Sequence, residues 1–352
     1  MADTFQIAAD IKEGQIFYYN QPFLLESGGF LPELNICYST YGQLNQSKNN
    51  VIWVCHALTG NANVLEWWGS IFGENKLFDP SDYFIVCANV IGSCYGSTEA
   101  LSINPTTQKP YLYDFPKLTM RDVSNSFELL RNHLNINKIH TCIGGSLGGQ
   151  QALEWAVSYP DLIENLVLLA TSARTSPWGI ALNETQRMAI RTDETWGKHD
   201  ANAGINGMKV ARAIALLSYR SYETYLATQI DHVDELENLK AVSYQRYQAE
   251  KFSTRFNAFA YCSLTYLLDS HNVGRNRGSV EAALGLVKAK TLIIGITTDV
   301  LFPNSEQEFL HKYIKNSSLH IIRSLYGHDG FLMETEKIQT IISGFYKTGL
   351  GL

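Results

Sequence analysis

Short, continuous apolar runs recur along the chain and are separated by segments with a helical pattern. The clearest runs span residues 51–55, 83–87, 166–169 and 291–294. They do not alternate with polar residues, which is typical of strands buried on both faces of a sheet. Between them, apolar residues recur at helical spacing, as at Ala152, Trp155 and Ala156. Strands that alternate with helices predict an α/β fold, with a mostly parallel central sheet flanked by helices.

Residues 176–279 follow a different pattern. Their apolar stretches, including 259–268, look helical, and no strong buried strand stands among them. Because sheet-like runs lie on both sides, we expect an inserted helical lid between two strands of the sheet. We therefore predict a core domain formed by residues 1–175 and 280–352 and a helical lid domain formed by residues 176–279. The glycine-rich segments 204–207 and 274–278 are expected to be loops of the lid.

Composition narrows the class of protein. The chain has 352 residues, 45% of them hydrophobic, which is enough for a large buried core. Its net charge is -6, and we see no basic stripe or tail, so the sequence argues against a nucleic-acid-binding protein. The negative net charge does not exclude an anionic substrate, because such a substrate needs only a locally positive pocket.

The six cysteines and the N-terminus indicate the compartment. The cysteines form no pattern with metal-ligand spacing, so we expect buried free thiols, no metal site and a reducing environment. The first six residues lack the basic and apolar regions of a signal peptide. No stretch approaches the roughly 18 apolar residues of a membrane span. We expect a soluble, cytoplasmic protein without membrane contact.

The segment 144–148 reads Gly-Gly-Ser-Leu-Gly and matches the nucleophile-elbow motif G-x-S-x-G. It follows the apolar run 139–143 and precedes a helix that starts near Gln150, which is the context that the motif requires. The glycines leave room for a strained turn that presents Ser146, and the helix N-terminus supplies N–H groups for an oxyanion. A structural Gly-Ser turn is the alternative, and we favour a catalytic Ser146.

A nucleophilic serine needs a base, and the base needs a carboxylate that orients it. In the fold that carries this elbow, the acid and then the histidine follow the serine along the chain. Asp299 follows the strand-like run 292–296, and His328 lies in a glycine-flanked loop after the run 319–322. We predict a Ser146–Asp299–His328 triad. A surface role for Asp299 and an ordinary loop position for His328 are the alternatives.

The loop after the first buried strand is expected to complete an oxyanion hole. It begins at His56, and the expected donors are the backbone N–H groups of Leu58 and of Leu147, the residue after the nucleophile. His56 could serve as a catalytic base. Its position directly after a strand and upstream of Ser146 favours a structural role.

Further motifs extend over nearly the whole chain. They include 25–28 (Leu-Glu-Ser-Gly), 56–60 (His-Ala-Leu-Thr-Gly), 89–98 (Asn-Val-Ile-Gly-Ser-Cys-Tyr-Gly-Ser-Thr), 102–105 (Ser-Ile-Asn-Pro), 119–122 (Thr-Met-Arg-Asp), 298–303 (Thr-Asp-Val-Leu-Phe-Pro) and 327–332 (Gly-His-Asp-Gly-Phe-Leu). With these motifs, from about residue 23 to about residue 335, the chain resembles the homoserine O-acetyltransferases, which have the α/β-hydrolase fold.

The resemblance implies a ping-pong reaction in which Ser146 takes an acetyl group from acetyl-CoA and L-homoserine then accepts it. The product would be O-acetyl-L-homoserine, a methionine precursor. Acetyl-CoA would be a co-substrate, with no permanently bound cofactor. The resemblance also implies that Arg212 binds the substrate carboxylate, that Asp329 binds its ammonium group and that Tyr219 forms a pocket wall. Packing positions are the alternatives for these three residues. The lid helices would form a homodimer.

Several positions differ from the family pattern and leave alternatives open. Leu147 stands where the family usually has Met, which is nearly volume-neutral. Residues 61–63 read Asn-Ala-Asn where Asp-Ala-His is commoner, and Tyr95 and residues 99–100 also replace commoner residues. A succinyl donor, a serine acceptor, a simple esterase that uses the same triad, and a catalytically inactive binding protein therefore remain alternatives. The Arg212 and Asp329 pair suits an amino acid, which a general esterase does not need.

Overall fold

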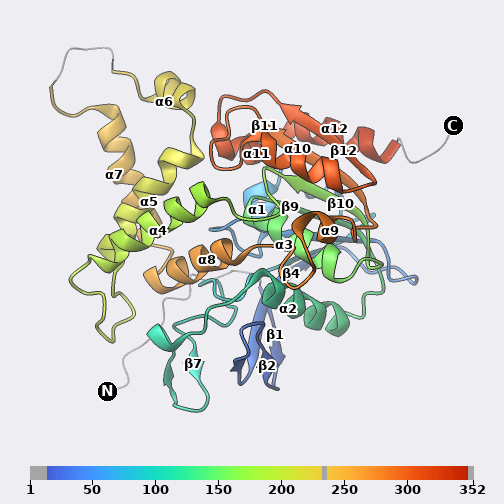
Figure 1. Cartoon of the computed structure of the whole chain (residues 1–352), viewed down its shortest axis with the longest axis horizontal. Coiled ribbons are helices and arrows are strands. Elements are labelled where there is room, and N and C mark those ends of the chain that lie inside the picture. The colour runs from blue at the N-terminus through green and yellow to red at the C-terminus, as the bar shows by residue number, and fades with distance from the viewer. Residues whose placement is uncertain (1–13, 232–235, 348–352) are drawn as a thin grey trace.

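The computed structural model describes residues 14–231 and 236–347, and its centre is an eight-stranded sheet (Figure 1). The strand order is β1-β4-β6-β5-β9-β10-β11-β12. The strands span β1 (Gln15–Tyr19), β4 (Leu34–Tyr41), β5 (Val51–Cys55), β6 (Phe84–Ala88), β9 (Ile139–Gly145), β10 (Ile163–Leu169), β11 (Lys290–Ile296) and β12 (Ser317–Ile322). β4 pairs antiparallel with β1 and with β6, and the other neighbours are parallel. The predicted mostly parallel sheet is confirmed.

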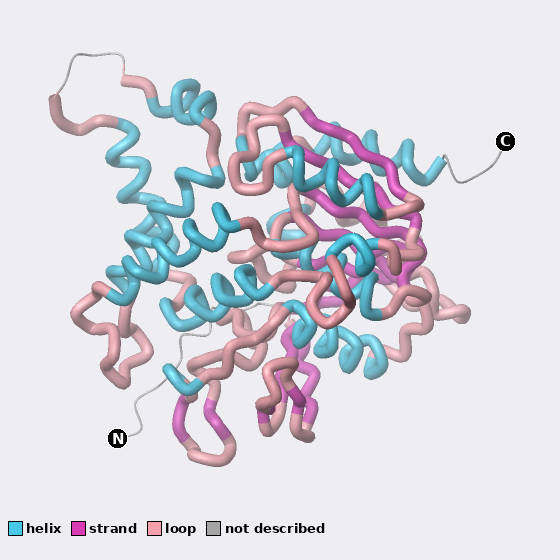
Figure 2. The backbone as a smooth tube through the Cα atoms, viewed as in Figure 1, coloured by secondary structure: helices cyan, strands magenta, loops and turns pink. Residues whose placement is uncertain are grey.

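Helices cover both faces of the sheet (Figure 2). Along β5, Trp53 and Cys55 pack in the core beneath α2 (Met120–His133) and α3 (Leu147–Ser158), whereas Ile52 and Val54 face the core beneath α12 (Thr335–Lys347). The remaining helices of the sheet layers are α1 (Val64–Trp68), α10 (Asn304–Tyr313) and α11 (Gly330–Met333). Burial on both faces explains why the strand sequences are continuously apolar.

A group of helices between β10 and β11 in the chain sits at one end of the sheet (Figure 1). They are α4 (Pro177–Arg191), α5 (Ile205–Tyr219), α6 (Tyr222–Gln229), α7 (Lys240–Ser253) and α8 (Ala258–Ser270). The short helix α9 (Val280–Leu284) follows them and lies beside the sheet, in contact with α10. The described part of residues 176–279 contains no strand, as expected of a helical lid. Two short hairpins, β2 (Phe23–Leu24) with β3 (Phe30–Leu31) and β7 (Ile103–Asn104) with β8 (Lys109–Pro110), lie outside the main sheet.

The predicted loop at residues 204–207 is wrong in part. Gly204 is the left-handed N-cap of α5, with φ of 79°, but the helix already begins at Ile205. Gly207 lies in the first turn of the helix, where a Cβ would be 2.5 Å from the carbonyl oxygen of Ala189 in α4. This glycine therefore allows α4 and α5 to pack closely and does not form a turn.

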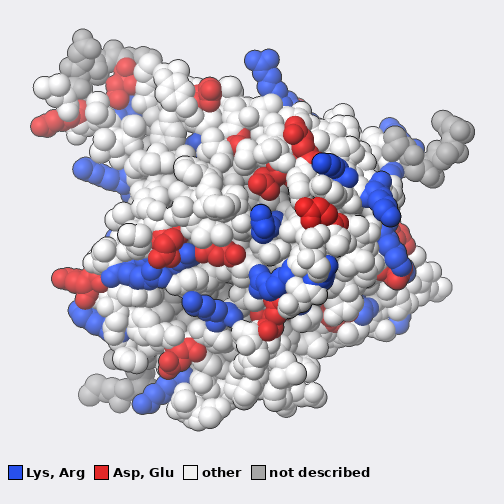
Figure 3. Space-filling view, viewed as in Figure 1, with Lys and Arg blue, Asp and Glu red and all other residues white. Residues whose placement is uncertain are grey.

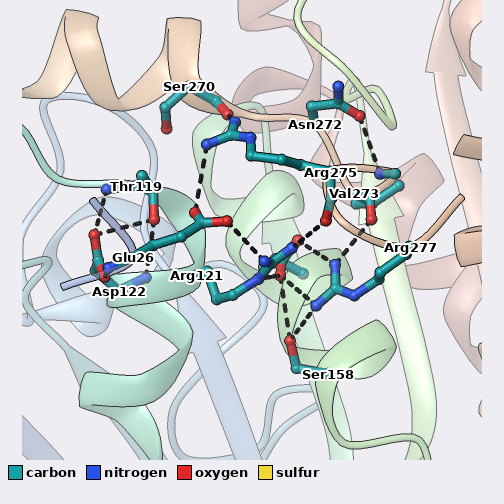
Figure 4. A network of polar contacts seen from close by, with 12 residues as sticks. Glu26, Thr119, Arg121, Asp122, Ser158, Ser270, Asn272, Val273, Arg275 and Arg277 are labelled. Atoms are coloured by element: carbon teal, nitrogen blue, oxygen red, sulfur yellow. Dashed lines mark hydrogen bonds and ion pairs between the residues drawn. The ribbon is translucent and has the colours of Figure 1, made fainter. Parts of the chain in front are cut away.

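An ion-pair network joins the core to the segment that returns from α8 (Figure 4). Arg121 in α2 lies 2.7 Å from Glu26 and 3.0 Å from Glu154 in α3. Arg277, after α8, lies 2.7 Å from Glu154, and Arg275 lies 3.4 Å from Glu26. The network links the helix that follows Ser146 to the end of the helical insertion.

The cysteines, the surface charges and the helices bear on the class of protein that the composition predicts. All six cysteines are free and five are buried, which confirms the expected free thiols; Cys262 is partly exposed. Acidic and basic side chains are interspersed on the face shown in Figure 3. The N-terminal segment in which we expect no signal peptide lies outside the described residues. In residues 14–231 and 236–347, none of the helices combines the length and apolarity needed to cross a membrane.

Candidate active site

Ser146 lies on a sharp turn between β9 and α3. Its backbone has φ of 57° and ψ of -124°, a strained conformation for a residue with a side chain. The turn is held on both sides, because Ser146 N donates to the carbonyl of Leu169 at 2.9 Å and Thr171 Oγ1 donates to the carbonyl of Ser146 at 2.8 Å. The structure therefore contains the strand–turn–helix arrangement that the motif predicts.

The side chains of His328 and Asp299 are in direct contact, although the two residues are separated by 29 positions in the chain. His328 lies in the single turn Gly327–Asp329 that precedes α11, and its Nδ1 is 2.7 Å from Asp299 Oδ2. The other oxygen of Asp299 accepts from the backbone N–H groups of Leu301 and Phe302 at 2.8 and 2.9 Å. The carboxylate is thus oriented by the loop after β11, and it fixes the imidazole so that Nε2 is left for a substrate or a nucleophile.

The environment of His328 favours a readily protonated imidazole. Burial opposes the charged form, but the negative charge of Asp299, its hydrogen bond and the charge of Asp329 outweigh burial. The pKa of His328 is therefore raised above its ordinary value. A base of this kind can hold a proton transiently during a reaction.

A cavity of about 270 Å³ is lined by six of the eight predicted site residues, all but Asp299 and Leu147, and we call it the large cavity. Ser146, His328, Leu58, Tyr219, Arg212 and Asp329 all line it. These residues come from the elbow, the loop after β5, helix α5 and the His328 turn. Leu147, the second predicted oxyanion donor, is the first residue of α3, so its N–H has no acceptor within that helix.

His56 is occupied by the backbone on both sides of its ring. Nε2 accepts from Val90 N at 3.0 Å, so Nδ1 carries the proton and donates to the carbonyl of Ala57 at 2.8 Å. Burial lowers the pKa of His56 to about 4, which keeps the ring neutral. These contacts fit the structural role that we favour for His56 from the sequence.

The side chains predicted to bind substrate bring both signs of charge to the large cavity. Arg212 lies over the rings of Tyr219 and Phe252, and its buried Nε has no hydrogen-bond partner among the described residues. Asp329 Oδ2 lies 3.0 Å from Nε of Arg220. Burial raises the pKa of Asp329, although the charges of Arg220, His328 and Arg212 oppose this effect.

Two arginines of the site were not predicted from the sequence. Arg220 balances the charge of Asp329, as described above. Arg255 lines the large cavity, donates to the carbonyl of Thr59 at 3.0 Å and also contacts the hydroxyl of Tyr95. The unusual Tyr95 is the only sequence signal near Arg255, because the two residues meet only through the tertiary fold.

The described ranges contain no group of three or more His, Cys, Asp or Glu side chains arranged to hold a metal ion. The chemistry that the site can support is nucleophilic: a strained serine, a buried His–Asp pair and backbone donors at a helix N-terminus suit acyl transfer. The charged groups in the same cavity suit a small zwitterionic ligand.

Comparisons with known proteins agree with this geometry. Residues 50–335 match the family described as alpha/beta hydrolase fold. The chain is 51% identical to a homoserine O-acetyltransferase of Cyclobacterium marinum over 94% of this chain and 95% of that protein. It resembles the crystal structure of a homoserine O-acetyltransferase from Staphylococcus aureus with a TM-score of 0.78 and 30% identity, over 97% of both chains.

The fold also resembles that of an acetylester hydrolase from Corynebacterium glutamicum, with a TM-score of 0.85, 22% identity and coverage of 95% and 96% of the two chains. That likeness shows the fold alone. The identity to the Cyclobacterium protein extends over nearly the full length of both chains. The chain therefore belongs to the homoserine O-acetyltransferase family of the α/β-hydrolase fold.

Proposed function

We propose that this protein is a homoserine O-acetyltransferase that uses Ser146, His328 and Asp299 as its catalytic triad. The observation that carries the proposal is that one cavity is lined by the serine, the histidine and two charged groups, Arg212 and Asp329, suited to an amino acid. Membership of the family supports the choice of acetyl-CoA and L-homoserine as substrates. The product is O-acetyl-L-homoserine, an intermediate of methionine biosynthesis.

In the first half-reaction, His328 Nε2 removes the proton of Ser146 as Oγ attacks the thioester carbonyl carbon of acetyl-CoA. The developing oxyanion is stabilised by the N–H groups of Leu58 and Leu147. The C–S bond then breaks, and the departing sulfur takes the proton from His328 as CoA leaves. Acetyl-Ser146 and neutral His328 remain.

In the second half-reaction, the side-chain hydroxyl of homoserine gives its proton to His328 Nε2 and attacks the acetyl carbonyl carbon. The same backbone donors stabilise the new oxyanion. The bond from the carbonyl carbon to Ser146 Oγ breaks, and Oγ recovers the proton from His328. Asp299 keeps the imidazole in the required tautomer and stabilises its protonated form in both halves.

Homoserine recognition rests on Arg212, Asp329 and Tyr219. The unpartnered Nε of Arg212 offers a donor to the substrate carboxylate, and a guanidinium can make two such bonds. Asp329 has one oxygen at Arg220, which leaves the other for the substrate ammonium group. Tyr219 lines the same cavity as a wall, with its ring centroid 6.0 Å from that of His328.

Two alternatives use the same triad. A succinyl donor or a serine acceptor would preserve the chemistry, and an esterase would pass the acyl group to water. The charged pair at Arg212 and Asp329 favours an amino-acid acceptor over water. The helical insertion over the site supports an acyltransferase, because an acyl-enzyme must be shielded from water until the alcohol arrives.

We also propose that residues 176–279 act as a lid domain over the core formed by residues 1–175 and 280–352, and that the lid mediates a cytoplasmic homodimer. Large apolar side chains are exposed on its helices, among them Trp178, Met188, Leu217 and Tyr222. Exposed apolar residues that gather in one region are typical of an interaction surface. The six free thiols support a reducing compartment.

The test is release of CoA thiol from acetyl-CoA or succinyl-CoA, each with homoserine, serine or no acceptor, with the product identified by mass spectrometry. We expect homoserine-dependent release from acetyl-CoA that Ser146→Ala abolishes. Ser253→Ala, at the end of α7, is the matched control and should retain activity. Preference for succinyl-CoA or serine would overturn the substrate assignment. Fast release without an acceptor would indicate a hydrolase, and an active Ser146→Ala variant would overturn the triad.

A further inference from the structure

A second, much smaller cavity also reaches Ser146. Its volume is about 20 Å³, against about 270 Å³ for the large cavity. Ser146, Leu58 and Tyr219 line both cavities, whereas His328, Arg212 and Asp329 line only the large one. Four leucines and Phe302 line the small cavity together with hydroxyl and amide side chains, and the described lining includes no charged side chain. We call this space the acyl cavity.

The geometry of acyl transfer distributes the substrate between the two cavities. The tetrahedral carbon on Ser146 carries an oxyanion, an acyl substituent and the atom that leaves or attacks. His328 must exchange a proton with the leaving sulfur and with the attacking hydroxyl, so both of these groups belong in the large cavity. The oxyanion belongs at the N–H groups of Leu58 and Leu147. The acyl substituent needs a third space at Ser146, and the acyl cavity provides it.

We infer that the acyl cavity holds the acyl substituent and that Leu182, Leu268 and Leu301 limit the donor to acetyl-CoA. This inference rests on the proposed function and adds the residues that set donor specificity. A water-sized group requires roughly 10–15 Å³ of such space, so about 20 Å³ accepts one methyl group but not a longer chain. The acyl cavity therefore fits acetyl and excludes propionyl, butyryl and succinyl by size.

Charge gives an independent reason to exclude succinyl. Its distal carboxylate would be buried without a cation, which is strongly unfavourable. The amides at the cavity carry no charge, and each already has one partner: Asn183 Nδ2 donates to Asp269 at 2.8 Å, and Gln186 Oε1 accepts from Tyr261. Arg187, which follows Gln186, is paired with Asp269 and with Glu184 at 2.5 and 2.8 Å.

The three leucines that are proposed to limit the donor come from three separate elements. Leu182 belongs to α4, as does Gln186, Leu268 belongs to α8, and Leu301 follows β11 beside Asp299. Phe302, the next residue, also lines the cavity, and its ring centroid lies 5.3 Å from that of His328. The size of the acyl group is therefore limited on one side by helices of the insertion and on the other by the loop that orients the catalytic histidine.

The experiment measures kcat/KM for acetyl-, propionyl-, butyryl- and succinyl-CoA with saturating homoserine. We expect the wild-type protein to lose about tenfold or more for each added methylene. Leu268→Ala and, separately, the half-buried Leu182→Ala should raise the butyryl-to-acetyl ratio at least about tenfold, without a comparable gain for succinyl. Leu267→Ala is the matched control: Leu267 is a buried neighbour in α8 that does not line the cavity, so it should leave the ratio unchanged.

Circular dichroism and thermal unfolding establish that each variant is folded. The inference is overturned if both folded cavity variants keep the wild-type ratio. It is also overturned if Leu332→Ala, which enlarges the large cavity, changes the ratio instead. The burst of p-nitrophenol released from p-nitrophenyl acetate and p-nitrophenyl butyrate measures acylation of Ser146 by each acyl group in the absence of any acceptor. If no acceptor-dependent transfer occurs but the burst ratio still shifts, the proposed function fails while the assignment of the cavity stands.

Discussion

Gly148 approaches the carbonyl oxygen of Cys55 so closely that a Cβ on the glycine would lie 2.0 Å from that oxygen. Cys55 is the last residue of β5, and the loop with Leu58 begins directly after it. The close approach therefore connects the turn that presents Ser146 to the loop that is proposed to supply an oxyanion donor. Both halves of the proposed acyl-transfer site depend on the absence of one side chain.

Gly148→Ala should damage both stability and acylation. Neither backbone can move away without disturbing β5 or α3, so we expect a loss of about 1–3 kcal/mol in the free energy of unfolding. Displaced oxyanion donors should also reduce the acylation rate about 10²-fold or more. Urea unfolding and the p-nitrophenyl acetate burst measure the two effects.

Gly344→Ala is the control for that substitution. Gly344 lies inside α12, and an added Cβ meets no atom within 4 Å. Alanine should stabilise this helix by about 0.5–1 kcal/mol and leave the burst intact. If Gly148→Ala behaves like Gly344→Ala, the close contact with Cys55 does not constrain the site.

Replacing Asp329 by Asn should move the acid limb of acylation to lower pH. His328 must be neutral to act as a base, so the rate falls as the pH drops through its pKa. The negative charge of Asp329 helps to raise that pKa, so removing this charge should lower the pKa of His328. The measurement is the pH profile of the acetyl-CoA burst without homoserine, with the exposed Asp114→Asn as the control. An unchanged or raised acid limb would contradict the electrostatic role of Asp329.

Much of this architecture follows from local sequence signals, and the rest depends on contacts that such signals do not contain. The run 51–55 coincides with β5, because a strand buried on both faces must be continuously apolar. Strand β4 (Leu34–Tyr41) was not predicted, since its polar residues interrupt the apolar pattern. The glycine at 207 suggested a loop, because close packing between helices and turn formation both favour glycine.

The site shows the same division. Ser146, Asp299 and His328 carry their signals in adjacent glycines and strand ends, so their positions could be predicted from sequence. Arg220 and Arg255 carry no local motif, and their relevance appears only when the fold brings them to Asp329 and Tyr95. The acyl cavity is likewise formed by side chains from elements far apart in the chain.

Arg212→Ala should impair homoserine use and leave acylation intact. The guanidinium is proposed to meet only the acceptor carboxylate, and a hydrogen bond to a charged group contributes about 1.5–3 kcal/mol. We therefore expect kcat/KM for homoserine to fall about 10- to 100-fold, while the acetyl-CoA burst keeps its rate. Arg246→Ala, an exposed arginine on α7, is the matched control and should change neither quantity. A slower burst in Arg212→Ala would show that the residue acts on the acyl donor as well.

Among the residues of the ion-pair network, Glu154 is the one whose substitution should lower the free energy of unfolding most. Its side chain is only 3% exposed and lies between Arg121 and Arg277, which are 20% and 16% exposed. Without the carboxylate, two partly buried guanidinium groups would face each other with no counter-charge from that position. Removing one partner of a buried ion pair destabilises by about 3–5 kcal/mol, because the remaining charge is left uncompensated.

Glu154→Gln should therefore lower the free energy of unfolding by about 3 kcal/mol, the lower end of that range, because glutamine still accepts a hydrogen bond. Glu250→Gln is the matched control: Glu250 pairs with Lys209 at 2.8 Å but is 66% exposed, so its loss should change stability by no more than about 1 kcal/mol. Urea unfolding at low and high salt distinguishes the two pairs, since salt screens exposed charges more strongly. Equal, small effects of both substitutions would mean that the network adds no more stability than surface ion pairs do, and that other contacts hold α3 to the end of the helical insertion.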